Sequence, residues 1–399
     1  MTERVLIAGM GPVGVVAATI LTRAGIPVTL FEAQADLPTD LRASTFHPPT
    51  LDMLHALDLA EPLVADGLIA STYQWRDRAT GEAATFDLGC LAGLSAFPFR
   101  LQCEQFKLTR LATERLANHP LATLHFASPI AQVAQNVDKV TVTLDDGRTF
   151  DGAYLVGADG ASSAVREALG ISFTGFTYAE QWVVASTPVD IATKIPNLAP
   201  VTYTADPDDW FVLLRTKDLW RVLIPVAEAA DADRVLSDAF IQNKLQSIAR
   251  HENPYDITHR TLYRVHQRIA DTYCKGRAAL AGDAAHINNP LGGMGMNGGI
   301  HDAVDLANKL VQIINHGAAP EPLLEHYAQQ RHAIAEEYVL THTHQNKQVI
   351  EERDPVKRKA HLERLKHIAT TPEAHLAHVR RGAMIDAVEK SMSLFPAQH

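Results

Sequence analysis

Residues 5–14 read Val-Leu-Ile-Ala-Gly-Met-Gly-Pro-Val-Gly, an apolar run that leads into a GxGxxG pattern at Gly9, Gly11 and Gly14. Small and apolar residues follow, and a second apolar run spans Val28–Phe31. Short apolar runs on either side of a glycine turn and a small-residue helix are typical of a βαβ unit. The N-terminus therefore predicts an α/β fold built on a parallel sheet.

The three glycines have separate physical roles in such a turn. The first permits the tight turn, the second lets the backbone approach a pyrophosphate, and the third lets the helix pack on the strand. Glu32 ends the second strand, 18 residues after Gly14, where a carboxylate can accept hydrogen bonds from ribose hydroxyls. The pattern predicts an adenine dinucleotide site and leaves NAD and FAD both open.

A second glycine-rich stretch lies at residues 276–302. An apolar strand at Ala278–Ala281 leads into Gly282-Asp283, then a loop from Pro290, then a helix whose first turn lies near Asn297. Backbone N–H groups at a helix N-terminus collect partial positive charge and suit an anionic or electron-rich ligand. We expect a large ligand to contact this loop.

The remaining chain alternates between sheet and helix. Val140–Leu144 and Thr149–Val156 read as a hairpin that continues into a buried strand. Residues 180–225 are rich in Val, Thr, Trp and Phe, which predicts a sheet in a separate layer. After Asn297 the apolar residues recur at helical spacing, so the C-terminal part is expected to be mostly helix.

Composition excludes several classes of protein. A chain of 399 residues with 46% hydrophobic residues can form two or three domains. Its net charge of −10 disfavours a nucleic-acid partner, and no apolar stretch is long enough to span a membrane. Its three cysteines lack disulfide or metal-ligand spacing, so we expect no metal site and a reducing, cytoplasmic location.

Three motifs together resemble the single-component flavin-dependent aromatic hydroxylases, the 4-hydroxybenzoate hydroxylase-like family. They are Asp159-Gly160 followed by Ser163 and Arg166, the Gly282-Asp283 pair, and the loop of Pro290–Asn297. The Arg42-Ala43 and Arg100–Gln102 segments fit the same pattern.

The resemblance implies a Rossmann-like FAD-binding domain interleaved with a β-sheet substrate domain and followed by C-terminal helices. The expected ranges are 1–73, 96–176 and 270–320 for the FAD-binding domain, 74–95 and 177–269 for the substrate domain, and 321–399 for the helical region.

Non-covalent FAD is the cofactor that the resemblance implies. Glu32 would hold the adenosine ribose, Arg42 and Gln102 the ribityl region, and the loop before Asn297 the pyrimidine edge of the flavin. The residues expected to bind FAD are Gly9, Gly11, Gly14, Glu32, Arg42, Gln102, Asp159, Asp283, Pro290, Gly293, Gly295, Met296 and Asn297. Two of them have structural alternatives, since Asp159 could cap a helix and Arg42 could form a surface ion pair.

The implied activity is hydroxylation of a small electron-rich aromatic or heteroaromatic ring through a flavin hydroperoxide. NADH or NADPH would be the reductant and dioxygen the oxidant, and a homodimer stays open as the assembly. His47 and His301 are the candidate acid–base residues, because histidine titrates near neutral pH, although His301 could equally serve in packing and His47 could equally lie in a loop or at the surface. The candidate substrate pocket consists of Tyr203, Trp210, Phe211, Arg215 and Trp220, all of which could instead be core, and Arg215 could pair with a substrate carboxylate or with Asp218.

Other flavoproteins compete with this interpretation. A flavin-dependent halogenase would show a second tryptophan where Val222 stands and a lysine soon after the glycine motif, yet the first lysine is Lys107. A flavoprotein reductase acting on isoprenoid double bonds would need a long apolar tunnel. A non-catalytic flavin-binding redox module is the alternative outside the enzymes.

Overall fold

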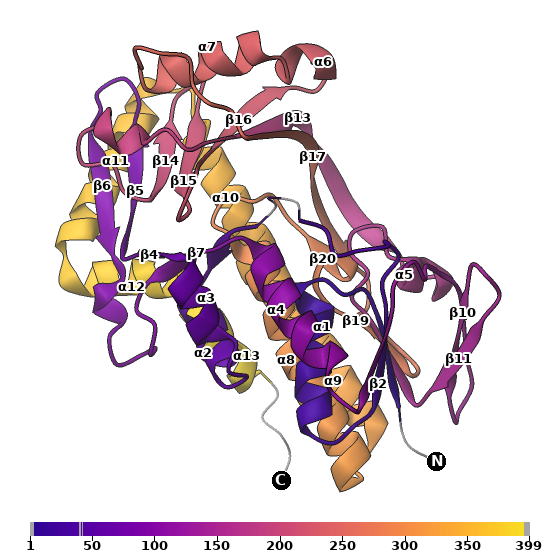
Figure 1. Ribbon diagram of the computed structural model, residues 1–399. Coiled ribbons are helices and arrows are strands. Elements are labelled where there is room, and N and C mark those ends of the chain that lie inside the picture. The colour runs from indigo at the N-terminus through magenta and orange to yellow at the C-terminus, as the bar shows by residue number, and fades with distance from the viewer. Residues whose placement is uncertain (1–3, 40, 42, 395–399) are drawn as a thin grey trace.

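The computed structural model describes residues 4–39, 41 and 43–394, and its base is a six-stranded sheet in the order β18-β19-β12-β1-β2-β8 (Figure 1). Neighbouring strands run parallel except β18 with β19. The strands are β1 (Val5–Ala8), β2 (Val28–Phe31), β8 (Ala122–His125), β12 (Tyr154–Gly157), β18 (Cys274–Lys275) and β19 (Ala278–Leu280). The predicted parallel α/β fold is confirmed.

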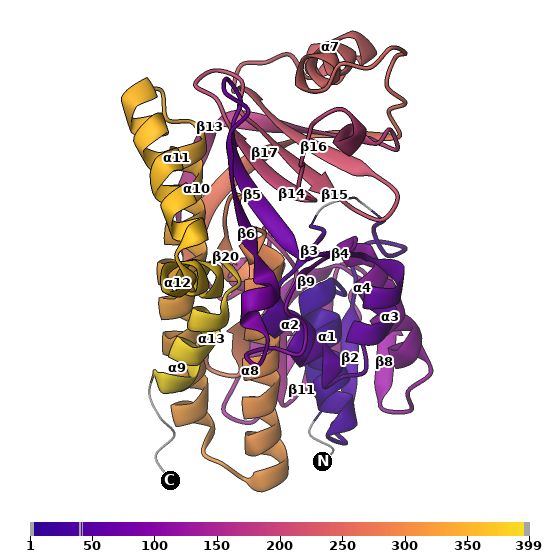
Figure 2. The ribbon, with the colours of Figure 1, turned by 90° about the vertical axis from the view of Figure 1, so that its left-hand side faces the viewer.

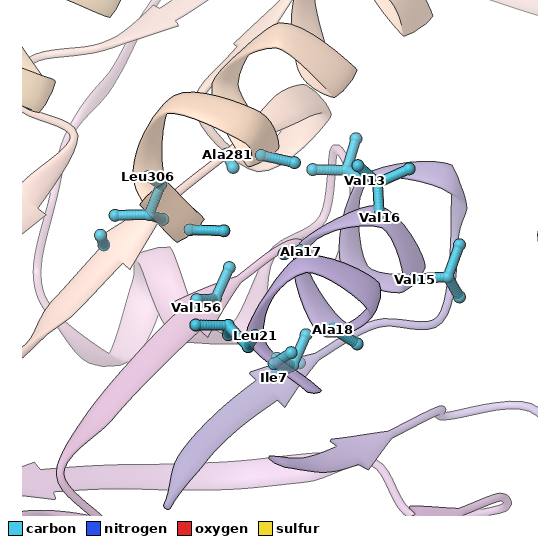
Figure 3. Close-up of a cluster of buried hydrophobic side chains, with 14 of the residues drawn as sticks. Ile7, Val13, Val15, Val16, Ala17, Ala18, Leu21, Val156, Ala281 and Leu306 are labelled. Carbon is cyan, nitrogen blue, oxygen red and sulfur yellow. The ribbon is translucent and has the colours of Figure 1, made fainter. Parts of the chain in front are cut away.

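Two helices pack against this sheet because their facing side chains are small or apolar. Figure 3 shows side chains of α1 (Pro12–Arg23) among those of β1, β12 and α8 (Met294–His316). Ala17 and Ala18 of α1 are fully buried there and allow close approach. Asn297 lies in the first turn of α8, as predicted.

The predicted run Thr149–Val156 is divided between two sheets. β11 (Thr149–Gly152) pairs with β10 (Val140–Leu144), which also pairs with β9 (Ile130–Gln135), in an antiparallel three-stranded sheet. β12 then enters the parallel sheet beside β1. The break follows Asp151-Gly152, an interruption of the apolar pattern that the prediction of one continuous run did not take into account.

A second large sheet has eight strands in the order β20-β17-β13-β16-β15-β14-β5-β6. Its strands are β5 (Thr72–Asp77), β6 (Ala83–Asp87), β13 (Phe173–Thr187), β14 (Val201–Ala205), β15 (Phe211–Arg215), β16 (Trp220–Ala227), β17 (His259–Ala270) and β20 (His286–Ile287). Early strands β5 and β6 join strands from much later in the chain, which is the interleaving that the sequence predicted.

The small sheet β3-β7-β4 lies near the middle of the molecule (Figure 2). It contains β3 (Thr45–Phe46), β4 (Leu68–Ala70) and β7 (Arg100–Gln102). The shorter helices are α2 (Pro48–His55), α3 (Ala60–Asp66), α4 (Gln105–Ala117), α5 (Ala164–Ala168), α6 (Ala232–Val235) and α7 (Asp238–Ile248), with 3-10 turns η1 (Leu88–Leu91), η2 (Ile191–Thr193) and η3 (Gly282–Ala284).

The eight-stranded sheet carries a hydrophobic cluster on each face because side chains alternate along its strands. On the inner face, Trp182, Tyr203 and Trp210 pack in one cluster with residues of the C-terminal helices. On the outer face, Phe211 and Trp220 pack with residues of α7. Figure 2 shows α7 over the sheet and α10 and α11 along its side.

The C-terminal part is helical, as predicted. Its helices are α9 (Pro320–Ile334), the π-helix η4 (Ala335–Leu340), α10 (Thr341–Ile350), α11 (Pro355–Thr370), α12 (Pro372–Gly382) and α13 (Ile385–Ser393). Within the described ranges, no helix combines the length and the apolar character that a membrane crossing requires.

Candidate functional site

The turn after β1 requires glycine at its ends and leaves open space at its middle. A Cβ atom on Gly9 would lie 2.3 Å from the Ala158 carbonyl oxygen, and one on Gly14 would lie 2.0 Å from the Gly9 carbonyl oxygen. A Cβ atom on Gly11 would meet no atom of the described residues within 4 Å. Because Gly11 precedes the first helical residue of α1, this open side exposes the helix N-terminus to an anion such as a pyrophosphate.

Glu32 lies beside this turn at the end of β2. Its carboxylate accepts hydrogen bonds from the Met10 N–H (3.1 Å) and the Gln34 N–H (3.0 Å). The side chain is half-buried, and each oxygen keeps a further lone pair. Glu32 can therefore hold the turn and accept from ribose hydroxyls at the same time.

Asp159 accepts hydrogen bonds at the start of helix α5. Helix capping was the alternative to FAD binding for this residue. Its carboxylate accepts from the Ser163 hydroxyl (2.5 Å) and the Val165 N–H (3.0 Å), while Ser163 caps the helix through the Arg166 N–H. Burial raises the pKa of Asp159, although these hydrogen bonds oppose the shift. The Arg166 side chain donates to the Ala284 carbonyl oxygen at 3.1 Å, which joins this segment to η3.

The loop before α8 is tied to β3 by a single amide side chain. Asn297 accepts from the His47 N–H (2.9 Å) and donates to the carbonyl oxygens of Thr45 (2.8 Å) and Gly293 (2.6 Å). Gly293 caps α8 with a φ of 67°, in the left-handed region that favours glycine. The N-terminus of α8 is thereby held against residues 45–47.

The structure brings the two glycine-rich stretches together. Cβ atoms added to Gly282 and Gly299 would lie 2.7 and 2.8 Å from the same Val13 methyl group. The starts of α1 and α8 and the turn η3 therefore meet at one edge of the parallel sheet. One extended dinucleotide can span both helix N-termini in this arrangement.

The other expected FAD residues lie around this edge, with one exception. Gln102 is buried, accepts from the Thr45 hydroxyl at 3.1 Å and has an amide nitrogen without a hydrogen-bond partner among the described residues. The unpaired buried amide fits a polar ligand such as the ribityl chain. Asp283 is exposed in η3, and Pro290, Gly295 and Met296 belong to the loop before α8 and its first turn. Arg42 lies outside the described residues.

His47 and His301 are buried and uncharged. The His47 Nε2 contacts the Gly292 carbonyl oxygen (2.8 Å), and the His301 Nε2 contacts the Thr50 hydroxyl (2.9 Å). Burial lowers the pKa of His47 well below its ordinary value and lowers the pKa of His301 to about 3. The expectation that both titrate near neutral pH does not match these surroundings, because neither is exposed to water.

The five expected pocket residues do not lie on one wall. Tyr203 and Trp210 belong to the inner face of the sheet, whereas Phe211 and Trp220 belong to the outer face. Arg215 lies over the Trp220 ring, and its nearest carboxylate is Asp190 at 3.9 Å rather than Asp218. Only two of the five therefore share the face that the C-terminal helices cover.

A buried ionic network, which sequence reasoning missed, supports the start of α8. Asp302 accepts from the Arg331 Nε (2.7 Å), the His286 Nε2 (2.8 Å) and the Gly282 N–H (3.1 Å). Burial raises the pKa of Asp302, but Arg331 and His286 outweigh burial and lower it to about 2. The available signal was a charged residue, Arg331, within the buried stripe of α9.

Sequence reasoning also missed Arg221, on β16. It is 3% exposed and donates to the Ser44 hydroxyl at 2.9 Å and to the Leu41 carbonyl oxygen. These hydrogen bonds join the eight-stranded sheet to the segment before β3.

Comparisons with known proteins agree with this geometry. Residues 2–341 match the family model described as "FAD binding domain". The chain is 33% identical over 333 residues to the 6-hydroxy-3-succinoylpyridine 3-monooxygenase of Pseudomonas putida, covering 81% of this chain and 83% of that protein. It is 30% identical to the para-nitrophenol 4-monooxygenase of a Pseudomonas species, covering 89% of each. The crystal structure of a p-nitrophenol 4-monooxygenase from Pseudomonas putida superimposes with a TM-score of 0.90 and 27% identity, covering 98% of both chains.

Proposed function

Because the chain belongs to the FAD-binding-domain family of flavin-dependent aromatic hydroxylases, we propose that it hydroxylates a small phenol-like or hydroxypyridine-like ring. It is an FAD-dependent aromatic monooxygenase. The observation that carries this proposal is that the N-termini of α1 and α8 meet at one edge of the parallel sheet. This edge lies beside the inner face of the second sheet. The two relatives named for a hydroxypyridine and a nitrophenol support the choice of ring.

In this proposal the FAD site follows the sheet edge. The turn Gly9–Gly14 would hold the pyrophosphate, Glu32 the ribose, and Gln102 the ribityl chain. Backbone N–H groups from Gly293 to Asn297 would contact the pyrimidine edge of the flavin, and their aligned dipoles stabilise negative charge there. Bound FAD supplies hydride acceptance from NADH or NADPH and reaction with dioxygen.

The chain itself positions the ring and limits water. Trp182, Tyr203 and Trp210 are at most 5% exposed and belong to the apolar cluster on the inner face, beside which the ring would bind. His47 and His301, being uncharged, act by hydrogen bonding rather than by titration near neutral pH. Dioxygen is the proposed oxidant, and a homodimer is the proposed assembly. We also propose a cytoplasmic location, because the three cysteines are unpaired.

A substrate screen tests this function. Purified protein should release unmodified FAD on denaturation, since the proposal has no covalent link. Phenolic acids, nitrophenols and hydroxypyridines should then be tested with NADH and with NADPH, following reductant loss and product mass. The expected result is ligand-stimulated reductant oxidation with a product heavier by one oxygen atom. Absence of bound flavin, or oxidation without any oxygenated product, would overturn the proposal.

A further inference from the structure

Arg100 is a buried cation that has no acidic partner among the residues that the structure describes. It lies on β7, is 3% exposed, and donates from Nη2 to the Gly382 carbonyl oxygen at 3.4 Å. Its guanidinium carbon lies 4.1 Å from the centre of the Tyr73 ring. The Nε and Nη1 donors have no hydrogen-bond partner, and Arg100 forms no ion pair within the described ranges.

The groups around Arg100 do not supply the missing negative charge. Burial raises the pKa of the Tyr73 hydroxyl, which stays protonated. Burial and the Arg100 charge lower the pKa of His47 well below its ordinary value and that of His378 to about 4. Burial, Arg381 and, more weakly, Arg100 lower the pKa of His342 to about 4. The region is therefore positive, with neutral polar groups around Arg100 and with Arg381 and Arg364 as further cations near His342 and His378.

Several donors point to a ligand in this region. Gln102 shares the face of β7 with Arg100, two residues away, and its unpaired amide nitrogen is the one assigned above to the ribityl chain, so the flavin and the anion would be neighbours. The His342 Nδ1 is also unpaired among the described residues, whereas the His47 Nδ1 is an acceptor, because the neutral ring donates from Nε2 to the Gly292 carbonyl oxygen. Buried donors without partners are rare in folded proteins, because water is lost and nothing replaces it. An oxygen-rich anion would satisfy the guanidinium donors, which form a planar fork.

The site lies on the substrate side of the proposed flavin position. The Arg100 charge helps to lower the pKa of His47. The backbone N–H of His47 donates to Asn297 in the first turn of α8. Tyr73 lies in the inner-face cluster with Tyr203 and Trp182. Arg100 is thus between the start of α8 and the inner face, with the end of α12 as its third neighbour.

We propose that Arg100 binds a negatively charged oxygen of the aromatic substrate, and that the C-terminal helix α12 positions the guanidinium through the Gly382 carbonyl oxygen. This inference rests on the proposed function, since the anion is part of the hydroxylated ring compound. The shared chemistry is an anionic oxygen, which a ring carboxylate or a phenolate can provide. Arg100 is then a specificity residue that selects acidic substrates over neutral ones of the same shape.

Ligand binding to the FAD-loaded protein, measured without reductant, tests the inference. The probes are 4-hydroxybenzoate and 4-nitrophenolate as anions and 4-hydroxybenzamide as the neutral match, each followed by the change in flavin absorbance. For Arg100→Met, the dissociation constant of at least one anion should rise by about 30-fold or more. The constant for the neutral amide should change by less than about threefold. Which anion responds distinguishes a carboxylate from a phenolate.

Two further variants keep the result interpretable. Arg100→Lys retains a charge but loses the fork, so anion affinity should fall between that of the wild type and Arg100→Met. Arg215→Met removes a half-buried cation from the outer face and should not alter anion preference. Flavin content checks folding, and if Arg100→Met fails to fold, the Arg100→Lys comparison decides.

Equal anion affinity in the wild type and the Arg100 variants would overturn the inference, as would binding by the wild type of neutral rings only or of no probe at all. The proposed function fails separately, when FAD is absent or no ring is oxygenated in the screen.

Discussion

Gly11 and Gly14 belong to the same turn but have different surroundings. A Cβ atom at Gly14 would overlap the Gly9 carbonyl, whereas one at Gly11 would meet no atom within 4 Å in the part of the chain that the structure describes. A glycine that the fold does not need and that faces a helix N-terminus is best explained by a ligand. The histidines also depend on their surroundings, because burial rather than residue type determines their charge.

The two glycines should therefore respond differently to alanine. Gly14→Ala should destabilise the protein with or without FAD, because backbone must move to admit the methyl group. Gly11→Ala should leave the melting temperature of the FAD-free protein unchanged while weakening FAD binding by about tenfold or more, since a methyl group would occupy the pyrophosphate approach. Thermal melting and flavin fluorescence titration measure both effects. Equal losses of stability in the two variants would contradict this assignment.

The buried His301 should make the protein sensitive to mild acid. Its pKa falls from 6.5 when unfolded to about 3 when folded, so between these values the unfolded state binds the extra proton and stability falls as the pH falls. From neutral pH to pH 5 this residue alone should cost about 2 kcal/mol of unfolding free energy. In urea titrations, His301→Gln should reduce by that amount the difference in unfolding free energy between neutral pH and pH 5. An unchanged pH dependence would show that His301 is not buried in the neutral form.

At the scale of elements, α8 connects the sheet, the glycine loop and the C-terminal helices. Its first turn is bound to β3 through Asn297, and Asp302 binds it to η3 and α9. Arg331 also donates to the Ser391 hydroxyl of α13 at 3.2 Å. The helix that follows the glycine-rich loop is thus positioned by residues that come both earlier and later in the chain.

Removal of Arg331 should weaken this connection strongly. Arg331→Met leaves the Asp302 carboxylate buried with a smaller compensating charge, so the free energy of unfolding should fall by about 3–5 kcal/mol. Arg380→Met removes a more exposed ion pair with Asp386 and Glu389 and should cost less than about 1 kcal/mol. Urea unfolding of both variants gives the comparison. Similar losses of unfolding free energy in the two variants would mean that the Asp302 network adds no more stability than a surface ion pair.

For the whole molecule, the eight-stranded sheet separates two environments. Its outer face is closed by α7, while its inner face meets the C-terminal helices and the segment before β3. The chain reaches this arrangement by returning to each sheet several times, as the strand orders show. A substrate site on the inner face consequently draws on residues from the beginning, the middle and the end of the sequence.

Mutations on the outer face of the eight-stranded sheet should affect stability and leave substrate binding unchanged. Phe211→Ala on the outer face should lower the free energy of unfolding by about 3–5 kcal/mol, as expected for a buried aromatic side chain. The KM for the substrate identified in the screen should stay within about twofold of the wild type. A large rise in KM without loss of stability would instead place Phe211 in the substrate pocket.

The sequence by itself determined the βαβ unit, the flavin family and the helical C-terminal part, because these depend on local spacing of glycine and apolar residues. The alternation of side chains along a strand also places Trp210 and Phe211 on opposite faces of the sheet. It does not tell which face the C-terminal helices cover. Only the tertiary structure placed Arg100 against Gly382 and Asp302 against Arg331. Such contacts depend on which elements pack together, and no local pattern records the charge or burial that a distant segment creates.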